Sequence, residues 1–111
     1  MKVYTGYRTP QGCIVKVHDD DGSSRDLPLR LDLRNHSPTG PEWGYAGSGP
    51  AQLSLGLAAD VLGDDERALD VYQDLKFKLV GRLPHDGWSL SEDQLRAAIR
   101  DIQDRDRGRQ S

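Results

Sequence analysis

The stretch His36–Gln52, HSPTGPEWGYAGSGPAQ, separates two halves of the chain that have different hydrophobic periods. Before it, apolar residues alternate with polar ones, which is the pattern of strands in a sheet with one buried face. After it, apolar residues recur every three or four positions, which is the pattern of amphipathic helices. Strands followed by helices indicate an α+β fold, because a βαβ arrangement would alternate the two.

Three runs ahead of this stretch predict an antiparallel β-meander. The first two are Val3–Arg8 and Cys13–His18, and the third is Leu27–Arg34, in which leucines alternate with polar residues. Pro28 cannot donate a backbone hydrogen bond, so the third run favours an edge strand or a bulge. Turn-forming residues fill the segments 9–12 and 19–24.

Three apolar stripes after the stretch predict three helices. The first has Pro50 in its first turn and stops at Gly63, as the positional preferences of these two residues expect. Asp64 or Asp65 can cap the second helix. The third begins at Ser91–Gln94, which has the pattern of a capping box.

The expected organisation is a single α+β domain over residues 1–104. It consists of a three-stranded antiparallel meander (1–34), a Gly/Pro-rich loop (35–50) and three helices packed against the meander (51–104), followed by a polar tail (105–111). A length of 111 residues is one domain's worth.

Composition excludes several classes of function. The net charge of -3 gives no general electrostatic footprint for nucleic acid, so nucleic-acid binding is disfavoured. No apolar run approaches the roughly 18 residues of a membrane span, and the chain opens without a signal-peptide pattern, so we expect a cytoplasmic protein with no membrane contact. Cys13 stands alone and the three histidines lie far apart, so neither a metal site nor a cofactor is predicted.

The loop is the predicted functional segment. Seven of the thirteen residues from Pro38 to Pro50 are Gly or Pro, so much of the excess of glycine is local. Loops held by a rigid scaffold are where binding and catalytic residues concentrate. The candidate binding residues are His36, Ser37, Thr39, Glu42, Trp43, Tyr45, Ser48, Gly49 and Gln52.

Several of these candidates have a structural interpretation beside the functional one. Trp43 and Tyr45 can stack on a ligand or cover the core. Glu42 can act as a general base, bond the N–H groups of the loop, or pair with Arg34. Gln52 can face a pocket with Ser48 or face solvent.

The segment before the first helix suggests an anion site. Gly47 and Gly49 flank Ser48 just before a helix N-terminus, where unpaired N–H groups and the helix dipole favour a phosphate or carboxylate. Ser48, His36 and Glu42 are the residue types of an acyl-transfer site, but their spacing does not match a known nucleophile motif. A helix cap is the favoured role for Ser48, and no catalytic residue is assigned.

The same stretch resembles a family of small prokaryotic and phage proteins classed as a domain of unknown function. Their shared motif is approximately H-S-P-T-G-F-E-W-G-Y-G-G-S-G-P-A-Q-L; here Pro41 replaces the usual Phe and Ala46 a frequent Gly. The resemblance extends over nearly the whole chain. It implies no known reaction.

Two functions are compatible with these patterns. The favoured one is a small regulatory protein that docks on a protein partner through the loop, with an anti-defence inhibitor from a mobile element as one version. The alternative is an enzyme or ligand-binding domain that holds a small anionic ligand at Ser48 and Gly49, with His36 and Glu42 as acid and base. Apolar residues off the main helix stripes suggest either a second buried face or a homodimer contact: Leu55, Phe77 and Val80.

Overall fold

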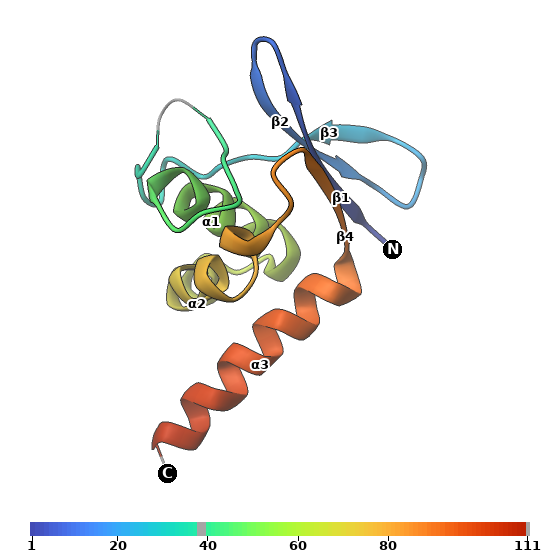
Figure 1. The fold of residues 1–111 in the computed structure, drawn as a ribbon. Coiled ribbons are helices and arrows are strands. Elements are labelled where there is room, and N and C mark those ends of the chain that lie inside the picture. The colour runs from blue at the N-terminus through green and yellow to red at the C-terminus, as the bar shows by residue number, and fades with distance from the viewer. Residues whose placement is uncertain (38–39, 111) are drawn as a thin grey trace.

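The computed structural model describes residues 1–37 and 40–110, with side chains described as far as residue 106. Its strands form one antiparallel sheet in the order β3-β2-β1-β4. The strands are β1 (Val3–Thr9), β2 (Gly12–His18), β3 (Ser24–Asp26) and β4 (Gly87–Ser91). The helices are α1 (Ser48–Leu62), α2 (Asp65–Lys78), the 3-10 turn η1 (Val80–Arg82) and α3 (Glu92–Gln110). An antiparallel sheet and three C-terminal α-helices confirm the α+β class, and α3 projects beyond the other helices (Figure 1).

The sheet is buried on the face that meets the helices. Register pairs Tyr4 with Val17 and Gly6 with Val15 between β1 and β2, and the alternation predicted for β2 is confirmed. Tyr7 alternates to the opposite face, where 42% of its surface is exposed. Helix α1 is buried on nearly every side, because α2, η1, α3 and the segment after β3 surround it.

The predicted strand Leu27–Arg34 is wrong, because the third strand covers only Ser24–Asp26. The Leu27 N–H still donates to the Val15 carbonyl at 3.1 Å, and the chain then leaves the sheet at Pro28. The Pro28 carbonyl instead packs on α1, where a Cβ on Gly56 would lie 2.7 Å from that oxygen. Leu27 and Leu29 therefore pack beside Gly56 of this helix, whereas Leu31 is exposed.

Strand β4 was not predicted from the sequence. It pairs with β1 on the side opposite β2, which makes the sheet four-stranded. Trp88 crosses over Gly6, where an added Cβ would lie 2.4 Å from the indole ring, so the glycine is needed for this contact. Buried Trp88 and Leu90 alternate with exposed Ser89, which is the pattern of a strand, but β4 is only five residues long and the pattern is correspondingly short.

Most of the predicted helix ends are confirmed. Gly63 ends α1 with φ of 63°, and Asp64 caps α2 by accepting from the Arg67 N–H at 3.2 Å. The capping box is reciprocal, since Ser91 N–H donates to Gln94 and Gln94 N–H donates to Ser91 Oγ. Helix α3 continues through the expected polar tail to Gln110.

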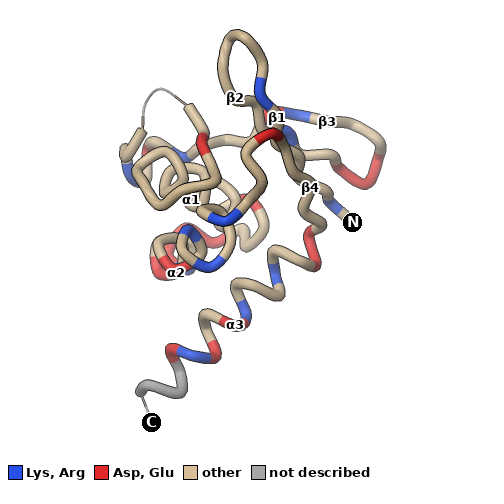
Figure 2. Tube along the Cα trace, in the orientation of Figure 1, with Lys and Arg blue, Asp and Glu red and all other residues tan. Residues whose placement is uncertain are grey.

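The off-stripe apolar residues have different surroundings. Leu55 and Val80 are fully buried in the core, whereas 57% of Phe77 is exposed. Acidic and basic residues are interspersed along α3 (Figure 2). In the described part of the chain, none of the helices is both long and apolar enough to cross a membrane.

One charged cluster ties the sheet to α1. Asp60 accepts from the Tyr4 hydroxyl and from Arg25, both at 2.8 Å, and Lys2 lies 3.5 Å away. Burial raises the pKa of Asp60, but these hydrogen bonds and cations outweigh burial and the net pKa is lowered. The ionised carboxylate therefore stabilises the fold.

Asp60→Asn should make the free energy of unfolding depend less on pH in the acid range. A lowered folded-state pKa means that Asp60 contributes fully above the unfolded-state pKa of about 4 and loses its contribution as pH falls through the folded-state value. We expect the free energy of unfolding of the variant at pH 7 to be about 1.5–3 kcal/mol below that of wild type. On acidification, the free energy of unfolding should fall less in the variant than in wild type. Urea unfolding at pH 7 to 2 measures both, with exposed Asp70→Asn as control. Parallel pH curves for wild type and Asp60→Asn would contradict the prediction.

Candidate functional site

Gln52 holds the first part of the loop. Its side chain is fully buried, and its Oε1 accepts from the backbone N–H groups of His36 at 2.7 Å and Ser37 at 3.2 Å. Its Nε2 donates to the carbonyls of Leu29 at 2.6 Å and Arg34 at 3.0 Å. Gln52 therefore has neither of the positions expected from the sequence, because it faces neither a pocket nor solvent but clamps two backbone segments to α1.

Trp43 is part of the core. Only 1% of its surface is exposed, and its Nε1 donates to the His85 carbonyl at 3.0 Å. Its ring meets Trp88 edge to face at 5.6 Å, and the Arg8 guanidinium lies 4.8 Å from the ring centroid. Trp43 therefore covers the core, which is the structural one of its two interpretations.

Glu42 pairs with Arg8 rather than Arg34. The two side chains meet through both carboxylate oxygens, at 3.1 and 3.2 Å, and the Cys13 thiol donates to Glu42 at 3.5 Å. Burial raises the pKa of Glu42, but the bonds from Arg8, Cys13 and the Trp43 N–H outweigh it and lower the pKa. A lowered pKa makes the carboxylate a weaker base. It also keeps the carboxylate ionised to lower pH, so that it remains paired with Arg8.

Arg8 is the residue of this cluster that sequence reasoning missed. Besides Glu42 it donates to the His85 carbonyl at 2.6 Å and to the Cys13 sulfur at 3.0 Å. It therefore connects β1, β2, the loop and the turn before β4. The available signal was alternation, which places Arg8 on the same face of β1 as Tyr4 and Gly6, where a charge needs a partner.

The second part of the loop lies against the start of α1. Gly47 is the N-cap and makes no side-chain cap bond, so the prediction that Ser48 caps the helix is wrong; Ser48 is its first residue and is exposed. A Cβ on Gly47 would lie 2.6 Å from the Tyr45 ring, and one on Gly49 would lie 2.6 Å from Glu42 Cβ. These two glycines allow the loop to approach the helix closely, because any larger residue would displace it.

The remaining candidates lie apart from these contacts. His36 Nε2 is 2.7 Å from the Tyr72 hydroxyl on α2, and the Ser37 hydroxyl donates to the Gly40 carbonyl at 3.2 Å. Thr39 lies outside the described residues. Within residues 1–37 and 40–106, no hydrogen bond given by the structure joins His36, Glu42 and Ser48 to one another.

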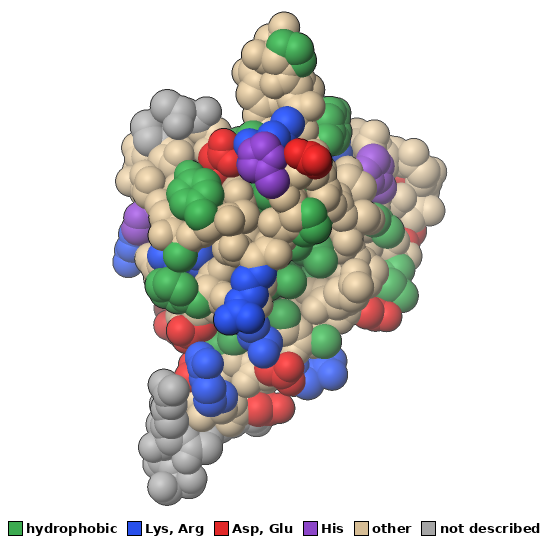
Figure 3. Space-filling view, viewed as in Figure 1, with side chains coloured by type: hydrophobic (Ala, Val, Ile, Leu, Met, Phe, Trp, Pro, Cys, Tyr) green, Lys and Arg blue, Asp and Glu red, His purple; other side chains and the backbone are tan. Residues whose placement is uncertain are grey.

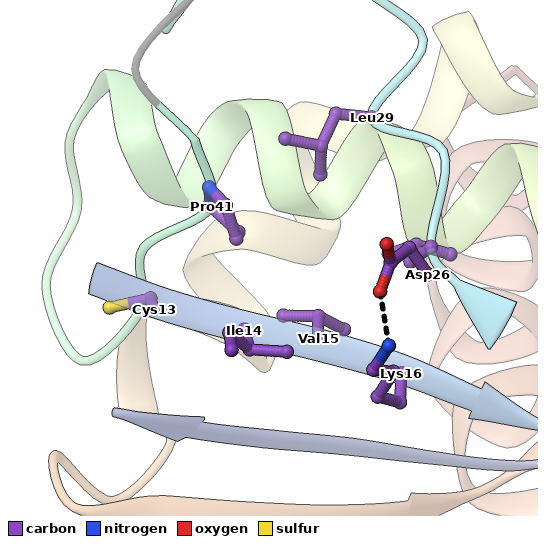
Figure 4. Close-up of a pocket in the computed structure, with 8 residues that line it drawn as sticks. Cys13, Ile14, Val15, Lys16, Asp26, Leu29 and Pro41 are labelled. Atoms are coloured by element: carbon purple, nitrogen blue, oxygen red, sulfur yellow. Dashed lines mark ion pairs between the residues drawn. The ribbon is translucent and has the colours of Figure 1, made fainter. Parts of the chain in front are cut away.

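Two hollows flank the loop beside β2. One has a volume of about 360 Å³ and lies between β2, Leu29 and Pro41 (Figure 4). The other, of about 260 Å³, is bordered by the Arg8–Glu42 pair, and both hollows include Cys13 and Pro41 in their walls. No group of three or more His, Cys, Asp or Glu residues suited to a metal ion occurs among the described residues.

Together these contacts define a small α+β domain that holds a Gly/Pro-rich loop between its sheet and its first helix. A model of the family of unknown function DUF6166 matches residues 4–101, and the chain belongs to that family. No curated protein and no solved structure matches the chain.

Proposed function

We propose that this chain is a non-enzymatic binding protein that docks on a macromolecular partner through the Gly/Pro-rich loop. The observation that carries the proposal is the contrast between the loop's fixed base and its exposed aromatic residue. Gln52, Trp43 and the Arg8–Glu42 pair hold the loop from beneath, whereas 51% of Tyr45 is exposed. A backbone that is already held in place, as it is around Trp43 and Tyr45, loses little entropy on binding, and tyrosine offers a large contact area with few rotatable bonds.

The surface beside Tyr45 supports a docking role. The Gly44 N–H donates to the Val80 carbonyl at 3.1 Å, and a Cβ on Gly81 would lie 3.1 Å from the Tyr45 carbonyl, so the loop packs on η1. Arg82 follows directly and donates through Nε to the carbonyl of Phe77 at 3.1 Å. Hydrophobic side chains lie beside basic ones on this face (Figure 3). Aromatic residues and arginine are enriched where binding energy concentrates in protein interfaces.

The partner in this proposal is a protein. The net charge of -3 gives no general electrostatic attraction to nucleic acid. The motif's resemblance to phage proteins extends the proposal to a regulatory role, in which the partner is a host protein and the chain inhibits host defence.

We do not propose the alternative acid-base function. His36 is engaged with Tyr72, and the Glu42 carboxylate is engaged with Arg8. A catalytic acid and a catalytic base would each need to lie within hydrogen-bond reach of the substrate atom that they protonate or deprotonate.

Tyr45→Ala should weaken partner binding at least about tenfold, because tyrosine is enriched among the interface residues whose truncation costs about 2 kcal/mol or more, and tenfold corresponds to about 1.4 kcal/mol. Tyr7→Ala is the matched control, since Tyr7 is a comparably exposed tyrosine on the opposite sheet face. Cross-linking capture from lysate of the cell that carries the gene, quantified by mass spectrometry, compares the two variants with wild type. Equal recovery of the same proteins by all three would reject the loop as the docking surface.

A further inference from the structure

The outer edge of β2 is only partly paired. Strand β3 pairs with Lys16, Val17 and His18, and the Leu27 N–H reaches the Val15 carbonyl. Along residues 12–14, β2 is paired with β1 on one side and with no described strand on the other. Alternate residues of a strand direct their backbone groups to the same side, so the N–H and C=O of Cys13 point to the open side, as the Val15 carbonyl does.

The chain's own departure from the sheet leaves this edge open. If the β2–β3 register continued, Leu29 would lie opposite Cys13. Instead the Leu29 carbonyl accepts from Gln52 on α1, and Pro28 packs on Gly56 of the same helix. The open edge is therefore the part of β2 that the wrongly predicted strand Leu27–Arg34 would have covered.

A groove runs along this edge. It has a volume of about 360 Å³, with Leu29 and Pro41 on one wall and the residues of β2 on the other (Figure 4). The Lys16–Asp26 ion pair lies at one end. At the other end Cys13 and Pro41 also border the second hollow, of about 260 Å³, beside Glu42. The groove thus combines an apolar wall with the backbone groups of Cys13, which have no partner strand among residues 1–37 and 40–110 on this side.

We propose that this groove binds an extended segment of a partner protein, which adds a short strand to β2 at Cys13. The inference deepens the proposed docking function and rests on it. The β2–β3 ladder sets the direction and spacing that the added strand continues, and Leu29 and Pro41 accept an aliphatic side chain of that segment. A partner helix has no free backbone groups for Cys13, so the occupant is an extended peptide.

Selection of a random dodecapeptide display library on the full chain tests the inference. We expect selected peptides to carry an aliphatic residue and to slow exchange of the Cys13 amide. N-methylation of the one peptide residue opposite Cys13 should weaken binding tenfold or more, and N-methylation of its two neighbours should have little effect, because only that residue directs its N–H to β2. Unchanged Cys13 exchange, or equal N-methyl effects at all three residues, would overturn the inference.

Variants of the groove wall provide the second arm. Leu29→Arg and Pro41→Arg should each weaken the selected peptide tenfold or more, whereas Leu31→Arg, at a site 42% exposed in the same segment, should not. If Leu29→Arg fails to fold, Pro41→Arg and the amide exchange of the wild-type chain decide the outcome. Peptide binding that is indifferent to the folded wall variants, or a concentration-dependent dimer that occupies the groove, would refute the inference.

The two proposals can fail separately. Partner capture that is lost in Tyr45→Ala but unchanged in Pro41→Arg supports docking by the loop and rejects the strand added to β2. Capture that is unchanged in Tyr45→Ala rejects the loop surface itself.

Discussion

Trp43→Ala should lower the free energy of unfolding by about 3–5 kcal/mol. The indole is 1% exposed, so its removal leaves a cavity between the loop and the sheet. The variant also loses the hydrogen bond to the His85 carbonyl and the edge-to-face contact with Trp88. Stability of a domain this small is of the order of 5–15 kcal/mol in total, so the loss is a large fraction of it. Urea unfolding followed by circular dichroism measures it.

Tyr45→Ala is the informative comparison for Trp43→Ala. Both aromatic residues belong to the same loop, but Tyr45 is half exposed, and we expect its removal to cost less than about 1 kcal/mol. The two residues would then have opposite profiles, with Trp43 affecting stability and Tyr45 affecting binding. A cost below about 1 kcal/mol for Trp43→Ala would be inconsistent with its buried position.

The different roles of these two aromatic residues show what the sequence can predict. Glycine and proline density located the loop, because those residues have strong backbone preferences that act locally. The same local pattern surrounds Trp43 and Tyr45, so it cannot tell which ring is buried. That depends on His85 and Trp88, which the fold brings from the segment around β4.

The predicted elements divide in the same way. The end of α1 at Gly63 and the capping box at Ser91 depend on neighbours within four residues, and both predictions are confirmed. The run Leu27–Arg34 has the alternation of a strand, but Leu27, Leu29 and Leu33 pack against the core outside the sheet and Leu31 is exposed. A hydrophobic pattern with a period of two does not ensure a strand, because tertiary packing can override it when another apolar surface lies within reach.

Gln52 is the position where this long-range packing is most concentrated. A glutamine one residue after Pro50–Ala51 in a helix is unremarkable by propensity, and its partners lie 15 to 23 residues earlier in the chain. Its amide matches two donors and two acceptors of the backbone at once. No smaller or apolar side chain can satisfy all four groups.

Gln52→Leu should therefore lower the free energy of unfolding by about 2–4 kcal/mol, since each backbone group that stays buried without a partner is costly. The volume of the side chain is nearly conserved, so the loss reports hydrogen bonding rather than a cavity. Amide exchange at His36 and Ser37 should become faster, because their N–H groups lose Oε1 as acceptor. Gln73→Leu, an exposed glutamine on α2, is the control and should change stability by no more than about 0.5 kcal/mol.

Gln52→Glu separates the two halves of the clamp. One carboxylate oxygen can still accept from His36 and Ser37, but the other would face the carbonyls of Leu29 and Arg34, to which Nε2 now donates. Burial beside two carbonyls raises the pKa of the introduced carboxyl in the folded state. Relative to wild type, the variant should then be most stable below the unfolded-state pKa of about 4.3 and lose stability as pH rises through the folded-state value. If the difference in unfolding free energy between the variant and wild type does not vary with pH, the hydrogen bonds that Gln52 Nε2 donates to these two carbonyls do not hold them in place.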